Sequence, residues 1–314
     1  MNPPASQRPD LPLVTLVTPA YNQAEFLEAA IDSVLAQTYP AIEYLVVDDG
    51  STDDTLALLQ RLGDRVRWRT QPNAGQARTI NDSWRQARGE IVGYLSSDDL
   101  LMPDAVASAV AALQSHPQAV ACYGDFDLID AAGRFIRTVS TEAYDRHRLV
   151  SDLVCLPGPG AFLRRAAFQE AGGWNPQLRQ IPDFDFWMRL SRVGPFVRID
   201  RNLAAYRIHA ESASFRQASP ERADEIVVAV SAFGADAAAA QAPEAARSQA
   251  MAHLIAARSH LNAGRLRTAG ARVSRALRLA PRRLLQPLIW RMLLGGLLRR
   301  AYYVVRAALG RNAA

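Results

Sequence analysis

Two pairs of adjacent aspartates, Asp48 with Asp49 and Asp98 with Asp99, each close an apolar, strand-like segment. In an open α/β sheet, ligands bind beyond the carboxyl ends of the strands. Carboxylate oxygens at such an edge suit a hard divalent cation, Mg²⁺ or Mn²⁺. For Asp98 and Asp99 the alternative is a solvated loop in which an aspartate caps the next helix.

The first hundred residues alternate strand-like and helix-like segments. Strands are predicted at 13–18, 43–47, 66–69 and 91–95, and helices at 26–35, at 53–62 and from 75 to about 88. This order predicts a mostly parallel sheet with helices on both faces. The chain contains no GxGxxG after the first strand and no GxxxxGK[ST]. A diphosphate bound at this edge would therefore need a metal rather than a glycine-rich cradle.

Local signals also predict how two of these helices begin. Asn22 and Glu25 have the spacing of a capping box for the first helix, and Ser51 is the expected N-cap of the second.

Several motifs in this order resemble the inverting family 2 glycosyltransferases of the GT-A fold. They are VTPAYN at 17–22, VVDDGSTDDT at 46–55, NAGQARTIN at 73–81, ARGEIVGYLSSDD at 87–99 and DFDFWMRL at 183–190. The resemblance covers about residues 11–214. It implies an α/β, GT-A-type (Rossmann-like) domain over 11–218, with a donor-binding half at 11–117 and an acceptor half at 118–218. Residues 1–10 are predicted to be a disordered tail and 219–314 a helical extension.

The resemblance implies a nucleotide-sugar site on the donor half. Its residues would be Thr18, Pro19, Ala20, Tyr21, Asn22, Asp48, Asp49, Asn73, Gly75, Arg78, Ser97 and Asp98. A carboxylate can accept hydrogen bonds from a pyrimidine imide N–H or from ribose hydroxyls. Two alternatives stay open: Asp49 and Gly50 can simply form a strand-to-helix turn, and Arg78 can be a surface arginine.

A divalent cation, Mn²⁺ or Mg²⁺, is implied at Asp99, Asp98 and His209. Ser96 stands where the commonest family pattern has its first aspartate, so fewer carboxylates are available to hold the metal. Mg²⁺ commonly binds through one or two carboxylates plus substrate phosphates. The alternative for His209 is a structural role.

Similarity assigns Asp183 as the general base that takes the proton of the acceptor hydroxyl. Asp183 and Asp185 lie about 200° apart on a helix, so they cannot share one role. The alternative is that Asp183 caps the helix. Aromatic neighbours would raise the pKa of this carboxyl and a helix N-terminus would lower it, and the sequence leaves the outcome open.

Acceptor contacts are expected at Asp125, Gly160 and Trp187. Asp125 follows a strand-like segment, where a carboxylate can orient a sugar hydroxyl or cap a turn. Gly160 lies in a loop with little side-chain bulk, which would let a substrate approach the backbone.

Composition limits the class of protein. The two cysteines lack CxxC spacing, which argues against a disulfide scaffold or zinc site and fits the cytoplasm. The N-terminus has no apolar core of signal-peptide length, and no run of 18 apolar residues is present. After Glu244 there are 14 arginines and no acidic residue, which leaves 22 arginines against 31 acidic residues before it. An acidic body with a basic tail, and no nucleic-acid-reading motif, argue against nucleic acid as a partner.

The tail is predicted to be helical. Residues 253–281 resemble a single tetratricopeptide-like helix pair. Residues 284–309 mix large apolar groups with arginine, as in an amphipathic helix at a membrane surface. This helix either binds an anionic membrane or packs on the protein through its apolar face.

The prediction is an inverting, metal-dependent sugar transferase. It would use a nucleotide sugar, expected to be a UDP-sugar, and a glycan or lipid-linked acceptor of cell-surface polysaccharide assembly. Its expected place is the cytoplasm or the inner face of the membrane. The alternatives are a nucleotidyltransferase on a similar scaffold, and a catalytically silent glycan- or partner-binding module, which Ser96 would favour.

Overall fold

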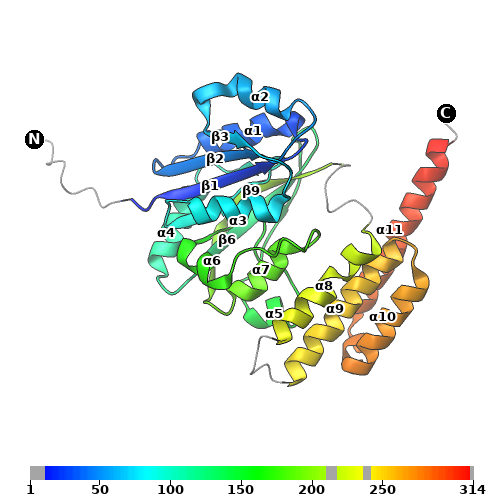
Figure 1. Cartoon of the computed structure of the whole chain (residues 1–314). Coiled ribbons are helices and arrows are strands. Elements are labelled where there is room, and N and C mark those ends of the chain that lie inside the picture. Colours follow the sequence, from blue (N-terminus) through cyan, green and yellow to red (C-terminus); the bar gives the residue numbers. More distant parts are fainter. Residues whose placement is uncertain (1–10, 210–217, 236–241, 312–314) are drawn as a thin grey trace, which may run out of the picture. The chain divides into compact units, whose positions relative to one another are not determined.

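The computed structural model describes residues 11–209, 218–235 and 242–311 (Figure 1). The predicted N-terminal tail lies outside these residues. The described chain divides into two compact units. The first consists of residues 11–144, 156–176 and 189–209, and the second of residues 145–155, 177–188 and the chain from 218 onward.

The first unit is built on a nine-stranded sheet with the order β3-β2-β1-β4-β8-β6-β9-β5, in which β7 also pairs with β6. The strands are β1 Val14–Ala20, β2 Ile42–Asp48, β3 Trp68–Thr70, β4 Ile91–Tyr94, β5 Leu100–Leu101, β6 Ala121–Asp130, β7 Phe135–Val139, β8 Phe162–Arg164 and β9 Phe196–Ile208. Strands β3, β2, β1 and β4 are parallel, as predicted, and β6 is parallel to β9. Strand β8 joins these parts by antiparallel pairs with β4 and β6.

The parallel register places the predicted ligand-binding loops at one edge of the sheet. Ala20 at the end of β1 lies opposite Asp48 at the end of β2, and Val17 lies opposite Tyr94 of β4. The chain therefore leaves β1, β2 and β4 at the same edge, where the carboxyl ends of parallel strands meet.

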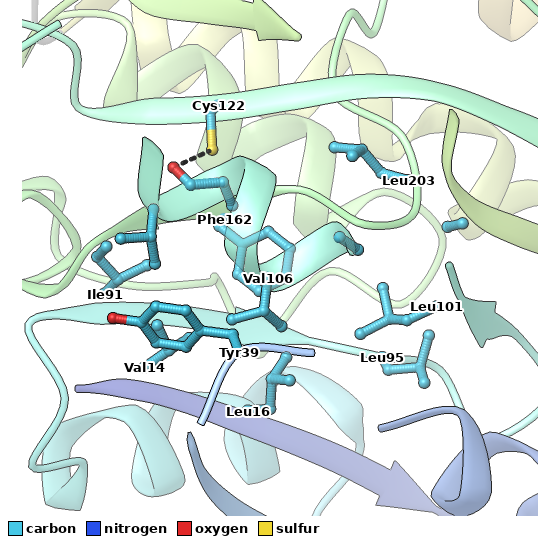
Figure 2. Close-up of a cluster of buried hydrophobic side chains, with 14 of the residues drawn as sticks. Val14, Leu16, Tyr39, Ile91, Leu95, Leu101, Val106, Cys122, Phe162 and Leu203 are labelled. Atoms are coloured by element: carbon cyan, nitrogen blue, oxygen red, sulfur yellow. Dashed lines mark hydrogen bonds between the residues drawn. The ribbon is translucent and has the colours of Figure 1, made fainter. Parts of the chain in front are cut away.

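Helices cover both faces of this sheet (Figure 1). They are α1 Ala24–Leu35, α2 Thr55–Leu62, α3 Gln76–Gln86, α4 Ala105–Ser115 and α6 Arg165–Ala171, with the 3₁₀ turn η1 Gly63–Arg65. Leu16 of β1 and Val106 of α4 belong to one buried cluster (Figure 2). Tyr94 is adjacent to Leu95 of this cluster, so the two side chains point to opposite faces of the sheet. On the face of Tyr94, the Trp84 ring of α3 lies 6.4 Å from the Tyr94 ring.

The predicted helix caps are wrong for both α1 and α2. Asn22 has a φ of 53°, and α1 begins after Gln23, which makes no side-chain cap. The Asn22 side chain instead accepts a hydrogen bond from the backbone N–H of Thr52, and Ser51 Oγ accepts one from the N–H of Asn22. These polar groups join the loop after β1 to the loop after β2 instead of capping their own helices.

The second unit is helical. Its helices are α5 Arg146–Val150, most of α7 Pro182–Leu190, α8 Pro220–Ala235, α9 Ala242–Asn262, α10 Leu266–Leu279, η2 Pro281–Leu285 and α11 Pro287–Arg311. The predicted helix pair is confirmed as α9 and α10, joined at Gly264, whose φ is 78°. In the described part of the chain, no helix has the length and apolarity that a bilayer-spanning segment needs.

The start of α11 packs on α9. Ile289 and Leu293 are buried in a cluster with Ala250, Leu254 and Ala257. One side of the predicted amphipathic helix therefore docks within its own unit, while other apolar residues of α11 stay exposed.

The central cluster sets the stability of the first unit. Leu16 is fully buried in it, whereas Leu35, at the end of α1, is 46% exposed. We expect Leu16→Ala to lower the free energy of unfolding by about 2–5 kcal/mol because it leaves a cavity. Leu35→Ala should change it by less than about 0.5 kcal/mol. Urea unfolding followed by circular dichroism measures both, and equal losses would contradict this assignment of the core.

Candidate active site

Asp49 organises the loop that follows β3. Its Oδ1 accepts hydrogen bonds from the Gln71 side chain (2.8 Å), the Ala74 N–H (2.9 Å) and the Thr79 hydroxyl (3.1 Å). Its Oδ2 accepts one from the Gly75 N–H at 2.7 Å. The side chain is 3% exposed. Four internal donors use most of the lone-pair capacity of one carboxylate.

Asp48 is buried as deeply but carries fewer bonds. Its Oδ1 accepts from the Ser51 N–H at 3.1 Å and its Oδ2 from the Thr70 hydroxyl at 2.7 Å. Half of its accepting capacity is therefore left for a further donor, which is more than Asp49 retains.

The turn after β1 is held against these loops. Thr18 shares a hydrogen bond of 2.9 Å with the Tyr44 hydroxyl, and Asn22 bonds to the loop after β2. Tyr21, between them, is 48% exposed. Pro19 and Ala20 continue β1, so the predicted turn begins only at Tyr21.

The loop at 71–75 closely approaches the loop after β2. A Cβ on Gly50, whose φ is 77°, would lie 2.8 Å from the backbone nitrogen of Asn73. Only glycine permits both this conformation and this approach. The backbone of Ala74 and Gly75 faces Asp49, while the side chains of Asn73 and Arg78 are exposed. The structure thus brings the predicted donor loops together at one edge.

Asp98 and Asp99 lie between β4 and β5. The alternative, that an aspartate here caps a helix, does not hold, because β5 follows directly and α4 begins only at Ala105. Asp99 is 2% exposed, and its Oδ1 accepts from the backbone N–H of Arg207 at 2.9 Å. Burial and the neighbouring Asp98 carboxylate raise the pKa of Asp99, and Arg207 offsets this only in part.

The Arg207 side chain fixes the same loop. Its Nε donates to the carbonyl of Asp98 at 2.8 Å, and its Nη1 donates to the carbonyls of Asp130 and Ala131 at 3.3 and 3.1 Å. The guanidinium carbon lies 4.9 Å from the centroid of the Phe26 ring, within cation–π range. A 5%-exposed arginine thus joins the end of β9 to α1 and to the 98–99 loop.

His209 reaches Asp98, as the predicted metal set requires. Its Nε2 lies 3.0 Å from Asp98 Oδ2, and its ring lies 4.8 Å from that of Phe26. The imidazole side chain is 7% exposed and the Asp98 side chain 20% exposed.

The donor set suits a divalent cation that also uses substrate oxygens. Among the residues that the structure describes, hydrogen bonds reach only Oδ2 of Asp98 and Oδ1 of Asp99, which leaves one oxygen of each carboxylate available. In the described part of the chain, no three histidine, cysteine or acidic side chains are grouped so that they could hold a metal ion by themselves. An open site with two carboxylates and a nearby imidazole fits Mn²⁺ or Mg²⁺, which complete their shells with phosphate and water.

Asp183 lies in the second unit, as the second residue of α7 after Pro182. It therefore follows the N-cap position instead of occupying it. Burial raises the pKa of Asp183, and backbone hydrogen bonds from Phe184 and from Asp183 itself only partly oppose this rise. Burial therefore outweighs the effect of the helix N-terminus on the pKa of Asp183.

The three predicted acceptor contacts have different surroundings. Asp125 is paired with Arg198 Nη2 at 2.9 Å and accepts from Thr141, so both its oxygens are engaged. Burial raises the pKa of Asp125, but hydrogen bonds from Thr141 and Arg198 outweigh it and hold the pKa below the usual range. Gly160 has a φ of 78° and is buried against Leu203 and Ala204. Trp187, in the second unit, is 3% exposed.

Residues 15–172 match the family model described as Glycosyl transferase family 2. The chain belongs to this family. The match begins in β1 and ends after α6, so it includes the donor loops and the 98–99 loop and stops before Asp183.

This glycosyltransferase is similar to a chondroitin synthase from Escherichia coli, with 32% identity over 211 residues. The match covers 66% of this chain and 30% of that protein. The match covers between 23% and 65% of the length of such curated relatives.

Two solved structures share its fold. S. aureus TarS 1–349 in complex with UDP-GlcNAc has a TM-score of 0.65 at 16% identity, over 93% of this chain and 91% of that one. Mannosyltransferase PcManGT from Pyrobaculum calidifontis, in complex with GDP-Man and Mn²⁺, has a TM-score of 0.61 at 19% identity, over 93% and 86%. The predicted fold class, a GT-A-type α/β sheet with a helical C-terminal part, is confirmed.

Sequence reasoning missed the residues that hold the site in place. From the sequence, no role is assigned to Arg207, Gln71, Thr70 or Thr79. One signal was available for Arg207: it stands two and four residues after the apolar Ala205 and Leu203, so it lies on the same face of the strand, where a buried guanidinium requires partners.

Replacing Arg207 by lysine should loosen this glycosyltransferase at the 98–99 loop. Lysine lacks the planar fork that serves three carbonyls, so buried acceptors would lose their donors. We expect Arg207→Lys to lower the free energy of unfolding by about 1–3 kcal/mol and to weaken Mn²⁺ binding, measured by urea unfolding and electron paramagnetic resonance. Arg201→Lys is the control, since Arg201 is 65% exposed in a surface pair with Asp104. If both variants behave alike, Arg207 does not support the site.

Proposed function

We propose that this glycosyltransferase transfers a sugar, with inversion, from a nucleoside-diphosphate sugar to an acceptor hydroxyl. The observation that carries the proposal is the convergence of two carboxylate pairs at one sheet edge: the hydrogen-bonded Asp48–Asp49 pair, and the Asp98–Asp99 pair with free oxygens. The nucleotide sugars in the TarS and PcManGT complexes support the donor class, and a UDP-sugar is our choice of donor.

On the donor side, we assign the two carboxylates after β2 different roles. Asp48 keeps accepting capacity and is the proposed contact to the nucleoside. Asp49 is saturated by its own loop and is the group that shapes the pocket. The exposed Tyr21 ring, the Asn73 side chain and the Arg78 guanidinium complete this side, where Arg78 supplies positive charge for the diphosphate.

Asp99 and Asp98 are the proposed ligands of a divalent cation, with His209 beside them. The Mn²⁺ in the PcManGT complex supports this part of the proposal. When bound, such an ion stabilises the charge that develops on the diphosphate leaving group. Ser97, 6% exposed, is the proposed hydroxyl contact to the donor in the same loop.

Asp183 is the proposed general base. The acceptor oxygen forms a bond to the anomeric carbon while the bond from that carbon to the diphosphate oxygen breaks. The acceptor proton passes to the Asp183 carboxylate, and the nucleoside diphosphate leaves. A base with a raised pKa holds this proton better than an ordinary aspartate does, which suits general base catalysis near neutral pH.

The proposed acceptor is a glycan or lipid-linked sugar of cell-surface polysaccharide assembly, used at the cytoplasmic face of the membrane. The similarity to a chondroitin synthase supports a polysaccharide product. Asp125, Gly160 and Trp187 remain the proposed acceptor contacts, with Asp125 acting through its ion pair with Arg198.

Asp183→Asn tests the reaction. With Mn²⁺ and a panel of nucleotide sugars, the wild-type chain should bind one donor and transfer its sugar, and a chelator should abolish transfer. Asp183→Asn should keep donor affinity and lose about 10²–10⁴-fold in kcat, since only the proton acceptor is removed. Isothermal titration calorimetry and release of nucleoside diphosphate measure the two quantities.

Asp64→Asn is the control for this experiment, because Asp64 is an exposed residue of η1 outside the proposed donor and acceptor contacts; its activity should be unchanged. A wild-type chain that binds no nucleotide sugar would instead support the silent binding module that Ser96 favours. Donor binding with an unchanged rate in Asp183→Asn would remove Asp183 from the mechanism.

The pH profile gives a second test of the base. Asp183 must be deprotonated to act, and burial raises its pKa. We therefore expect kcat/KM to fall as the pH is lowered through a pKa above the ordinary value of about 3.9, at constant donor affinity. Initial rates measured across the acidic pH range give the pKa at which kcat/KM falls. A pKa at or below the ordinary aspartate value would contradict the assignment of Asp183 as the base.

A further inference from the structure

A cavity of about 710 Å³ lies within the second unit, between α5, α9, η2 and the start of α11. Its charged lining contains Arg148, Arg247, Arg282 and Arg283 against one acidic residue, Asp152. None of the proposed steps of sugar transfer uses these residues. The surplus of guanidinium groups makes the cavity a site for an anion.

The acidic residue is already occupied. Asp152 Oδ1 accepts from Arg283 Nη1 at 2.6 Å, and Asp152 Oδ2 lies 3.7 Å from Arg148 Nε. Arg283 also donates to the carbonyl of Ser151 at 2.9 Å, so its position is fixed. Arg247 and Arg282 are exposed and make no ion pair within the described part of the chain. These two arginines are available for an external anion.

The other half of the lining is apolar. Met251, Leu279 and Ile289 form part of the wall, and Leu288, 67% exposed, lies at its edge. A free phosphate or a sugar phosphate would leave this apolar surface in water. The lining therefore favours an anion that carries a hydrocarbon part.

Exposed apolar residues continue from the cavity along η2 and α11. They are Leu285, Trp290, Leu294 and Leu298, which are 80%, 51%, 55% and 71% exposed. The Trp290 Nε1–H already donates to the carbonyl of Leu284 at 2.7 Å, so the indole can enter an apolar phase without losing a bond to water. Leucine and tryptophan next to arginine are the composition of a helix that lies in a membrane interface.

We propose that this cavity binds the phosphate of an anionic phospholipid, while the exposed apolar residues of η2 and α11 insert among its acyl chains. Charge complementarity supports this partner: after Glu244 the chain has 14 arginines and no acidic residue. Phosphate pairs with guanidinium groups through two parallel hydrogen bonds. The proposal rests on the proposed function only in placing the enzyme at a membrane.

Flotation of the full chain with vesicles tests the proposal. The chain should float with equal parts of phosphatidylglycerol and phosphatidylcholine and stay unbound with phosphatidylcholine alone. The double variant Arg247→Ala, Arg282→Ala should bind about 30-fold more weakly. The matched control is Arg267→Ala, Arg275→Ala, which removes two exposed arginines of α10 that do not line the cavity. Equal losses in both double variants would show diffuse surface attraction and overturn the site.

A second variant tests the apolar contribution. Leu294→Ser, Leu298→Ser should retain binding at low salt but detach at high salt, because screening weakens only the charged contacts. If this variant binds the vesicles at high salt as strongly as the wild-type chain does, the apolar residues of α11 do not contribute to the contact. Binding to a polyprenyl phosphate in neutral vesicles, without binding to phosphatidylglycerol, would assign the cavity to a lipid-linked substrate and overturn the proposal.

Sugar transfer is measured separately, without vesicles and with a soluble acceptor. The cavity variants should keep Mn²⁺-dependent donor binding, because their residues lie outside the proposed donor site. Loss of lipid binding and loss of transfer are thus distinguishable outcomes.

Discussion

The buried guanidinium of Arg207 is the interaction on which the candidate metal loop depends. A cation that is 5% exposed must have its donors satisfied, and here carbonyls of Asp98, Asp130 and Ala131 accept them while Phe26 covers the group. Its own backbone N–H orients Asp99. A loop that would be free to move in an isolated β4–β5 connection is thereby tied to the end of β9. The oxygens of Asp98 and Asp99 that accept no hydrogen bond from the described residues lie on a fixed backbone, as the proposed ligand set requires.

The two aspartate pairs show how environment separates identical side chains. Asp49 accepts four internal hydrogen bonds, so its carboxylate mainly shapes the 71–75 loop. Among the described residues Asp99 accepts one, from Arg207, and burial together with the repulsion of Asp98 raises its pKa. A cation between Asp98 and Asp99 would relieve that repulsion, whereas the Asp49 network needs no ligand for its stability. A structural carboxylate and the proposed metal ligands can thus share one sheet edge.

The charge distribution divides the chain into an acidic part and a basic part. Residues up to Glu244 carry more acidic than basic groups, whereas the residues after Glu244 include 14 arginines and no acidic residue. An acidic region would be repelled by an anionic bilayer, so the proposed membrane attachment depends on a basic element that also offers apolar contacts. Strand and helix packing leaves such an element in η2 and α11, where Ile289 and Leu293 are buried and Trp290 and Leu298 are exposed.

The sequence by itself determined the strand–helix order, the position of the aspartates at strand ends, and the basic helical tail, because these follow from periodicity and composition within short windows. It misjudged the caps at Asn22 and Ser51, whose partners lie about thirty residues away. Only the tertiary structure decided which carboxylate oxygens stay free, which partners neutralise Arg207, the direction of the Asp183 pKa shift, and which apolar residues of α11 remain exposed. Each of these depends on groups far apart in the chain, such as Asp99 and Arg207, that local patterns cannot relate.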